Sequence, residues 1–270
     1  MEFRRIESKS NPTIKSVSAL GLKKERDSRK KFCFEGIHLL EEYIRSGRRP
    51  DSVIVRDGCE KGKELAENSS ALNLFSVNDA VYSKLSSEKA PQGVITVSSF
   101  TDNVVFASEK SDITDFLSRA EGNIIILDSL QDCGNVGTII RTASAFGFSV
   151  MICGDSADVF SAKTVRASMG ALFFADIIVC RDKELAVSAL RQTGRRVLAC
   201  ALRKNGYILS EFDIKDNDCF IIGNEGNGID EKIISLCDGT VTVPMTDKVE
   251  SLNASSAASV IMWEAGRNRL

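Results

Sequence analysis

The sequence has little histidine, proline or tryptophan, and it lacks the motifs of several common enzyme classes. Its 270 residues include one histidine, four prolines and one tryptophan. A single histidine, His38, excludes the paired-histidine zinc sites and leaves at most one histidine-dependent nucleophile. Gly62-Lys63 is followed by Glu64 and lacks the glycines that precede the lysine of a phosphate-binding loop. We therefore expect chemistry that needs no metal ion.

Long hydrophobic runs and paired cysteine motifs are also missing. Apolar runs such as Ile124–Leu127 are far shorter than the roughly 20 residues that cross a bilayer. The first residues, Met-Glu-Phe-Arg-Arg-Ile-Glu, alternate charged and apolar side chains and lack the core of a secretion signal. The eight cysteines form no C-x-x-C pair, and several interrupt apolar runs, as reduced core thiols do. These features predict a cytoplasmic protein without a membrane span.

Charge is distributed unevenly although the formal net charge is only −2. Residues 1–50 hold 13 Lys and Arg against 7 Asp and Glu, so this segment carries +6 and the remaining residues −8. A basic end beside an acidic body is typical of a protein that holds an anionic partner at one end. Composition alone equally allows a solvated, charged helical surface.

Hydrophobic patterning predicts two domains. Around a short strand at Phe32–Phe34, apolar residues recur at helical spacing between Asn11 and Gly47. Val53–Val55 and Gly93–Val97 are β-rich. A polar stretch then marks a boundary. We predict a small α/β domain at 1–105, a linker at 106–122 and a second domain at 123–270.

The second domain alternates short apolar strands with amphipathic helices, which predicts an α/β fold with a mostly parallel sheet and helices on both faces. Ligands of such sheets bind beyond the carboxyl ends of the strands. The expected strands are 124–127, 150–153, 177–179, 197–201, 220–222 and 241–243, and the expected helices are 138–146, 183–192, 231–237 and 254–266.

Three loops that follow predicted strands carry most of the signal. In the first, residues 127–138, two glycines and Asn135 precede a helix that displays Arg141, and such a turn offers backbone N–H groups to an anion or a ribose. Helix capping by Asp132 or Asn135 explains the same pattern. In the second, residues 221–230, Glu225 stands among glycines spaced G-x-x-G-x-G, the reverse of the dinucleotide fingerprint, which argues against a nicotinamide dehydrogenase.

The third loop, residues 241–258, places Pro244 and Met245 after a strand and forms an apolar shelf. Ser251 or Asn253 then caps the final helix, whose small residues let it approach another backbone closely.

Taken together, the three loops resemble the ordered motifs of the SpoU (TrmH-like) RNA ribose methyltransferases of the SPOUT superfamily. The matching segments read L-D-x-x-x-D-x-G-N-x-G-T-I-I-R-T-A, I-I-G-N-E-G-x-G-I, and V-P-M with E-S-L-N-x-S-x-A. The N-terminal part, with Asn11-Pro12, Lys15, Phe34-Glu35-Gly36 and Pro91-Gln92-Gly93-Val94, is similar to the substrate-binding domain that often precedes them.

The resemblance implies transfer of a methyl group from S-adenosylmethionine to a ribose 2′-hydroxyl of RNA, in a homodimer whose cofactor lies in a trefoil knot. Ribosomal RNA, most commonly 23S rRNA, is the expected substrate. A tRNA methyltransferase and a non-catalytic RNA-binding protein that keeps the fold are the alternatives. Cys133 stands where the family usually has proline.

The resemblance also assigns residues. Arg141 is interpreted as a ribose or phosphate clamp, because a guanidinium stays protonated at neutral pH and is a poor base. Glu225 would orient Arg141 or the RNA, and Asn135 would hold ribose or phosphate. The candidate catalytic residues are Asn135, Arg141, Glu225, Ser251 and Asn253; the cofactor residues are Cys200, Ala201, Gly223, Asn224, Val243, Met245 and Leu252; the RNA-binding residues are Lys15, Lys23, Lys24, Arg26, Arg29 and Lys30.

Overall fold

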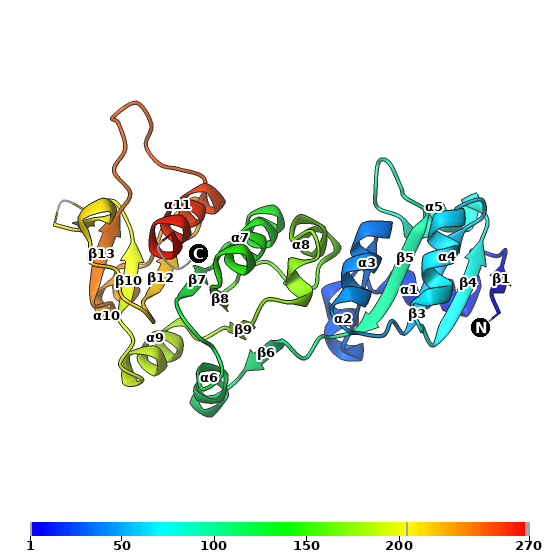
Figure 1. Ribbon diagram of the computed structural model, residues 1–270, viewed down its shortest axis with the longest axis horizontal. Coiled ribbons are helices and arrows are strands. Elements are labelled where there is room, and N and C mark those ends of the chain that lie inside the picture. The colour runs from blue at the N-terminus through cyan, green and yellow to red at the C-terminus, as the bar shows by residue number, and fades with distance from the viewer. Residues whose placement is uncertain (1, 204, 268–270) are drawn as a thin grey trace. The chain divides into compact units, whose positions relative to one another are not determined.

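A computed structural model describes residues 2–203 and 205–267 of the chain (Figure 1). The chain forms two compact units. The N-terminal unit consists of Met1–Thr101 together with Asp158–Phe173, and the C-terminal unit consists of Asp102–Ala157 together with Phe174–Leu270. Each unit therefore draws on residues that are distant in the sequence.

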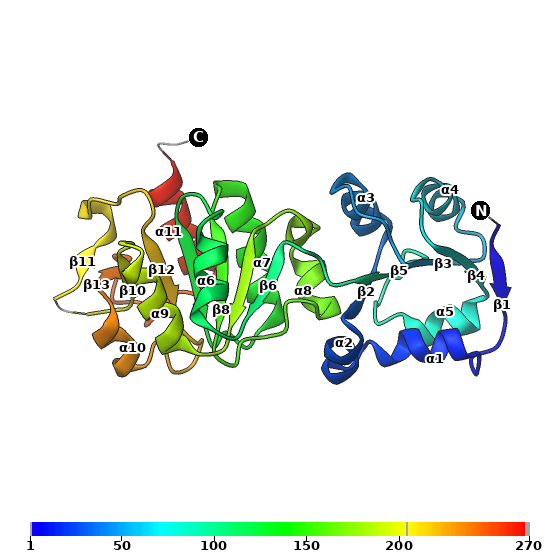
Figure 2. The ribbon, with the colours of Figure 1, turned by 90° about the horizontal axis from the view of Figure 1, so that it is seen from below.

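The N-terminal unit is a five-stranded mixed sheet between two layers of helices (Figure 2). Its strands are β1 (Arg4–Ile6), β2 (Lys31–Glu35), β3 (Ser52–Arg56), β4 (Asn73–Val77) and β5 (Val94–Ser99), in the order β1-β4-β3-β5-β2. Its helices are α1 (Pro12–Ala19), α2 (Lys23–Arg29), α3 (Ile37–Arg45), α4 (Glu60–Asn68), α5 (Asp79–Leu85), α8 (Ala162–Ala167) and the 3-10 helix η1 (Ala171–Phe173).

Both faces of this sheet are buried because its strands carry apolar residues on alternate sides. Ile54 and Ile95 pack against α1 and α5, whereas Val53 and Val55 pack against α3 and α4. The segment Asp158–Phe173 belongs to the same unit: the Phe160 ring lies 4.7 Å from that of Phe32.

The C-terminal unit is built on an eight-stranded sheet in which every described strand pair is parallel. The strands are β6 (Val104–Ala107), β7 (Ile124–Asp128), β8 (Ser149–Cys153), β9 (Ile177–Cys180), β10 (Val197–Cys200), β11 (Tyr207–Ile208), β12 (Cys219–Ile222) and β13 (Gly239–Thr242), in the order β11-β13-β10-β12-β7-β8-β9-β6. The helices are α6 (Lys110–Leu117), α7 (Cys133–Phe146), α9 (Lys183–Gln192), α10 (Glu231–Leu236), α11 (Ala254–Gly266) and the 3-10 helix η2 (Leu209–Glu211).

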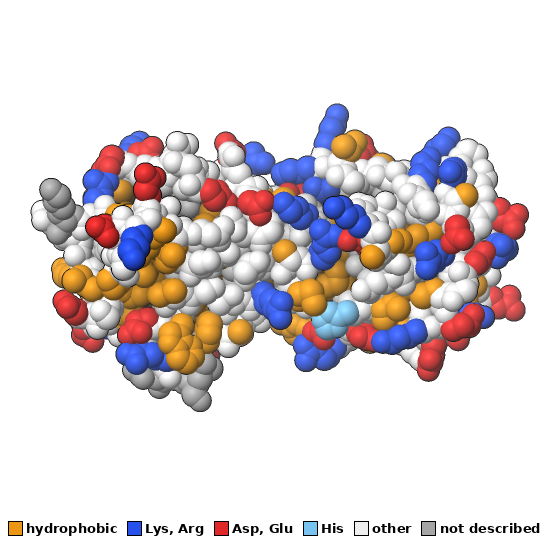
Figure 3. All heavy atoms as spheres, turned by 90° about the horizontal axis from the view of Figure 1, so that it is seen from above, with side chains coloured by type: hydrophobic (Ala, Val, Ile, Leu, Met, Phe, Trp, Pro, Cys, Tyr) orange, Lys and Arg blue, Asp and Glu red, His pale blue; other side chains and the backbone are white. Residues whose placement is uncertain are grey.

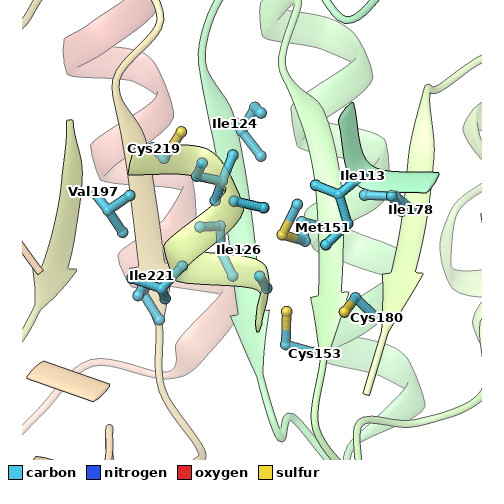
Figure 4. Close-up of a cluster of buried hydrophobic side chains, with 14 of the residues drawn as sticks. Ile113, Ile124, Ile126, Met151, Cys153, Ile178, Cys180, Val197, Cys219 and Ile221 are labelled. Carbon is cyan, nitrogen blue, oxygen red and sulfur yellow. The ribbon is translucent and has the colours of Figure 1, made fainter. Parts of the chain in front are cut away.

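Helices cover both faces of this sheet, as expected for parallel strands. On one face Ile124, Ile126 and Ile221 pack with residues of α6, α9 and α10 (Figure 4). On the other face lie α7 and α11, whose side chains Phe146 and Trp263 meet edge to face at 5.9 Å. Burying full strand faces removes several hundred Å² of apolar surface from water, at roughly 25 cal/mol per Å².

The predicted fold class is confirmed, and every strand and helix expected in the second half is present, with all ends except the start of α7 within two residues of the prediction. The domain boundary differs from the prediction. The segment 106–122, expected to be a linker, contains α6 and the end of β6, because Ile113, Phe116 and Leu117 are spaced to bury one helix face. Its charged residues cover only the exposed face of that helix, which explains its linker-like composition.

Candidate active site

Four loops of the C-terminal unit meet at one edge of its sheet. The strands β13, β10, β12 and β7 are consecutive neighbours and run parallel, so their carboxyl ends share that edge. The first motif follows β7, the second follows β12 and the third follows β13. Sequence order and sheet order differ, and this permutation brings the three motifs together.

The first motif winds directly into α7. The helix begins at Cys133, earlier than the predicted Thr138, because the Asp132 side chain caps it by accepting the Asn135 backbone N–H at 3.0 Å. Val136 and Gly137 are buried in the first turns. Both interpretations of this loop therefore hold. Asp132 supplies the helix cap, so the Asn135 side chain is not needed for capping and is available for another contact.

The side chain of Asn135 binds Glu225 of the second motif. Its amide nitrogen donates to Glu225 Oε1 at 3.0 Å. The backbone N–H groups of Gln131 and Asp132 also donate to the Glu225 carboxylate, each at 3.3 Å. The predicted anion-binding turn thus holds a carboxylate of the chain itself.

These hydrogen bonds determine the ionisation of Glu225. Burial raises its pKa, but the hydrogen bonds from Asn135 and from nearby backbone N–H groups outweigh burial and leave the pKa below its ordinary value. Glu225 is therefore an anion at neutral pH. Of the two predicted tasks of Glu225, orienting Arg141 or the RNA, the first is not seen, since in the described part of the chain Glu225 bonds to the first motif and not to Arg141. Orientation of the RNA stays a prediction.

Two further residues of the second motif have structural roles. A Cβ atom on Gly223 would lie 2.5 Å from the backbone of Gly228, so only glycine fits this turn. Asn224 accepts the N–H groups of Gly226 and Asn227 and donates to the Ser129 carbonyl at 2.8 Å. Its side chain therefore shapes the loop and ties it to the first motif, which leaves it little capacity for a cofactor.

A mainly apolar hollow lies beside these loops, between the ends of β10 and β13 and helix α11. Five of the seven predicted cofactor residues line it: Cys200, Ala201, Val243, Met245 and Leu252. Gly223 and Asn224 do not, although Gly223 follows Ile222, which pairs with Cys200. Sequence reasoning missed five further lining residues, Leu202, Val241, Thr242, Ala257 and Ile261. The small residues at the start of α11 were the one signal that could have found Ala257.

The hollow fits S-adenosylmethionine in chemical character. Its apolar walls suit an adenine ring, and within the described residues Met245 and Leu252 spend no backbone group on an internal hydrogen bond. Thr242 Oγ1 donates to the Ala201 carbonyl at 2.7 Å and holds two walls of the hollow together. No described group of His, Cys, Asp and Glu side chains could hold a metal ion.

The third motif divides into a wall and a cap. Ser251 lines the hollow and is exposed. Asn253 caps α11: its Oδ1 accepts the Ser255 N–H at 2.9 Å and the Ser256 N–H at 3.4 Å. The capping interpretation of Asn253 is therefore observed, and it places Asn253 one residue from the hollow-lining Leu252.

Arg141 lies on the exposed side of α7 and has no hydrogen bond or ion pair to any described residue. Helix α7 begins directly after the backbone N–H groups that bind Glu225, and it packs against α11. The guanidinium is thus a cation with all of its donors available. Its helix starts in the first motif and packs against α11, the helix of the third motif.

The six predicted RNA-binding residues differ in accessibility. Arg26 is corrected: it is 5% exposed, donates to Asp158 Oδ2 at 2.6 Å and also binds the Leu20 and Gly21 carbonyls, so it is a buried structural cation. The remaining five residues are exposed, but Lys23 pairs with Asp27 and Arg29 with Glu25. Lys30 lies over the Phe100 ring. Lys15 and Lys24 have no ion pair to any described residue.

Both units match known protein families. The SpoU rRNA Methylase family matches residues 122–263, which is more than half of the chain. The MRM3-like substrate binding domain matches residues 11–96. The two matched ranges lie on either side of the segment that contains β6 and α6.

Relatives of similar length support the same assignment. The chain is 29% identical over 97% of its length to the 23S rRNA (guanosine(2553)-2′-O)-methyltransferase RlmP of Bacillus subtilis, 98% of which is covered. An AdoMet-bound rRNA methyltransferase from Sinorhizobium meliloti aligns with a TM-score of 0.84 at 26% identity, covering 99% of both chains. The SpoU methyltransferase AviRb from Streptomyces viridochromogenes, in complex with AdoMet, aligns with a TM-score of 0.81 at 25% identity, covering 96% of this chain and 99% of that one. The chain belongs to the SpoU rRNA methylase family.

Proposed function

We propose that this protein transfers a methyl group from S-adenosylmethionine to a ribose 2′-hydroxyl of 23S rRNA. One observation carries the proposal: the apolar hollow at the ends of β10 and β13 shares a sheet edge with the Glu225–Asn135 pair and with the helix that carries Arg141. A cofactor in the hollow and a ribose held by Asn135 and Arg141 would then lie at the same edge.

S-adenosylmethionine, when bound, supplies a methyl group already activated by its sulfonium. The chain contributes position: aligning a hydroxyl oxygen with the methyl carbon at about 3 Å is worth roughly 7–11 kcal/mol at the ideal limit. No charged side chain lines the hollow, so the sulfonium of a bound cofactor would be the only charge within it. Neither contribution requires a metal ion.

The polar residues have distinct tasks. Arg141 binds a phosphate or ribose oxygen of the RNA through its guanidinium donors. Asn135 presents its side chain to the ribose, and Glu225 fixes the orientation of that side chain by accepting from its amide nitrogen. Ser251 lines the hollow, and Asn253 holds the first turn of α11 in place.

The N-terminal unit binds the RNA. Lys15 and Lys24 offer free ammonium groups for phosphate contacts, and the match to a substrate binding domain supports this role. The expected setting is the cytoplasm, where bacterial ribosomal RNA is found. In the described residues, no helix combines the length and apolarity required to cross a membrane.

We also propose a homodimer. Helix α11 exposes Val260 and Trp263, at 41% and 53%, and Leu252 at its start is 37% exposed. Figure 3 shows hydrophobic side chains gathered on the visible face of the C-terminal unit. A second copy that covers this face would bury them, and light scattering should give twice the chain mass. A monomeric mass at micromolar concentration would contradict the dimer.

The arginine variant Arg141→Ala tests the catalytic proposal. We expect loss of methylation of 23S rRNA fragments by at least about a hundredfold, while calorimetry finds the affinity for S-adenosylmethionine within a few-fold of the parent value, because Arg141 does not line the hollow. The exposed Arg181→Ala is the matched control. Activity largely retained in Arg141→Ala would exclude the clamp role.

Calorimetry on the unaltered chain separates this proposal from the alternative of a non-catalytic RNA-binding protein. The enzyme binds S-adenosylmethionine with a measurable heat, whereas absence of binding at millimolar cofactor would favour the non-catalytic protein.

A further inference from the structure

A second hollow lies in the N-terminal unit, at the start of α3. It is formed by the end of β2, the first turn of α3, the loop 86–92 and the residues around α8. Glu35, His38, Glu88, Gln92, Arg166 and Met169 contribute to its lining, and its volume is about 110 Å³. A single planar ring system fits a space of this size.

The hollow is preformed by a hydrogen-bond network. The Glu35 carboxylate accepts the hydroxyls of Tyr82 and Ser86, each at 2.8 Å. Gln92 Oε1 accepts the Ile37 N–H at 2.9 Å and so caps α3 from outside the helix. Gly36 adopts a φ of +126°, and a Cβ there would lie 3.1 Å from Gln92 Oε1, which requires glycine. The motifs Phe34-Glu35-Gly36 and Pro91-Gln92-Gly93 thus build the two sides of one cavity.

A further wall comes from a distant part of the chain. Arg166 of α8 forms an ion pair with Glu88 of the loop. Met169 follows α8, is 43% exposed, and has a φ of +51°, a conformation that costs free energy for any residue other than glycine. An exposed methionine held in this way presents its polarisable side chain to whatever occupies the hollow.

The polar groups of the hollow select its occupant. Arg166 already pairs with Glu88, so the lining's excess charge is that of Glu35, which has no ion pair among the described residues and disfavours an anion such as phosphate. Glu35 uses two donors of the roughly four that a carboxylate accommodates, so it retains acceptor capacity. The Gln92 amide nitrogen has no partner among the described residues and supplies a donor. The hollow therefore suits a flat, uncharged ring that carries several N–H donors and one acceptor on the same edge.

We propose that this hollow binds one unpaired guanine of the RNA substrate, with the guanine N–H groups donating to Glu35 and its carbonyl accepting from Gln92. Guanine presents more N–H donors on its Watson–Crick edge than the other bases. Met169 packs on the ring, as thioethers do on aromatic systems. On the face of this unit seen in Figure 3, basic, acidic and apolar side chains lie around the histidine, and the basic ones suit the backbone on either side of the bound base. The inference rests on the proposed RNA substrate and adds a base-reading site remote from the methyl transfer.

Short RNAs test the proposal with the full chain. The probes are four seven-nucleotide RNAs, uridine throughout except for guanine, adenine, cytosine or uracil at the centre, and fluorescence anisotropy at fixed low salt gives their Kd values. We expect the guanine heptamer to bind at least about fivefold more tightly than the uracil heptamer. Equal affinities for all four, or a preference for another base, would overturn the assignment.

Two variants locate the preference. Gln92→Glu keeps an oxygen to cap α3 but removes the amide donor, and Met169→Ala removes the packing surface. Each should abolish the guanine preference and leave the Kd for the uracil heptamer within about twofold. Asn68→Asp and Leu72→Ala make the same chemical changes at exposed positions elsewhere in the unit and should preserve the preference. A preference that survived in both hollow variants would place guanine recognition elsewhere.

The heptamer assay is independent of methyl transfer. If the chain failed to bind S-adenosylmethionine but kept a guanine preference that both hollow variants abolished, the proposed function would fail while the guanine site stood.

Discussion

Glu225 binds the chain's own backbone at the turn where the sequence suggested an external anion. The glycines and Asn135 of the first motif do create an anion site, as predicted, but the carboxylate comes from the second motif, about 90 residues later. Sequence spacing alone could not reveal this, since the two motifs become neighbours only through the pairing of β7 with β12.

Replacing Glu225 tests the positioning role. Glu225→Gln should lower methylation by about ten- to a hundredfold, because an amide accepts fewer of these hydrogen bonds and Asn135 loses its orientation. Cofactor affinity should change little, since Glu225 does not line the hollow. Single-turnover assays and calorimetry measure the two effects, with Glu211→Gln, at an exposed position, as control. Unchanged turnover would show that Asn135 needs no such support.

The lowered pKa of Glu225 gives this prediction a pH dependence. The hydrogen bonds favour the anion, so their stabilisation is complete above the ordinary value of about 4.5 and is lost as the pH falls through the lowered pKa. Between pH 6 and 9 the activity profiles of the parent and of Glu225→Gln should therefore have the same shape. A parental profile with an additional inflection in that range would contradict this assignment.

Arg26 illustrates a different failure of sequence reasoning at the residue scale. Its place in a basic run predicted RNA contact, yet it lies on the buried face of α2 and pairs with Asp158, 132 residues away. We expect Arg26→Ala to lower the free energy of unfolding by about 3–5 kcal/mol, because it leaves a buried carboxylate unpaired. Lys24→Ala, at an exposed site, should change it by less than about 0.5 kcal/mol. Urea titration measures both free energies of unfolding. Equal values for Arg26→Ala and Lys24→Ala would contradict the structural role of Arg26 and would favour RNA binding instead.

At the scale of elements, the sequence predicted best where hydrophobic periodicity was strong. The strands and helices of the C-terminal unit follow from apolar runs and amphipathic spacing. Helix α6 was missed because Lys110, Asp112 and Asp115 mask three buried residues on its other face. Strand β1 was missed because it has only three residues, and β4 was missed although it is as long as β3, since nothing in the sequence reveals that it pairs with β1 and β3. The trefoil knot stays a prediction.

Helix α11 connects the cofactor hollow to α7, so its N-terminal cap tests whether Asn253 acts through structure. Asn253→Ala should cost about 0.5–2 kcal/mol and reduce methylation, whereas Asn253→Asp keeps a capping oxygen and should restore both. Thermal unfolding and turnover measure these effects. Loss of activity in Asn253→Asp at parental stability would instead indicate direct contact with RNA or cofactor.

At the scale of the whole molecule, the N-terminal unit is discontinuous in sequence. Residues 158–173 belong to it, and their aromatic side chains complete its core: Phe160 packs on Phe32, and Phe173 lies 5.2 Å from Phe34. The segment lies between β8 and β9 of the other unit. The alternation of strands and helices continues through it, so the sequence did not reveal that it belongs to the N-terminal unit.

Deleting residues 1–101 should therefore not yield a soluble, well-folded methyltransferase domain. Phe160 and Phe173 would lose their partners, so we expect the truncated chain to bind hydrophobic dyes and aggregate. The same truncation with Phe160→Ser and Phe173→Ser should remain soluble. Dye fluorescence and light scattering report the difference, and a soluble, dye-free truncation with both phenylalanines intact would contradict the assignment of this segment.

Because truncation disturbs both units, point variants are better suited to measure how much each cation contributes to RNA affinity. Each phosphate contact released should reduce the slope of log affinity against log salt by about 0.7–0.9. Lys15→Ala with Lys24→Ala removes two free cations and should reduce the slope by up to about 1.8, weakening binding at low salt more than at high salt. Lys23 is already paired with Asp27, so Lys23→Ala should change the slope by less than either of those single variants. A slope unchanged in the double variant would mean that the phosphates are held by other cations, and the local excess of positive charge in residues 1–50 would then be a solvated surface.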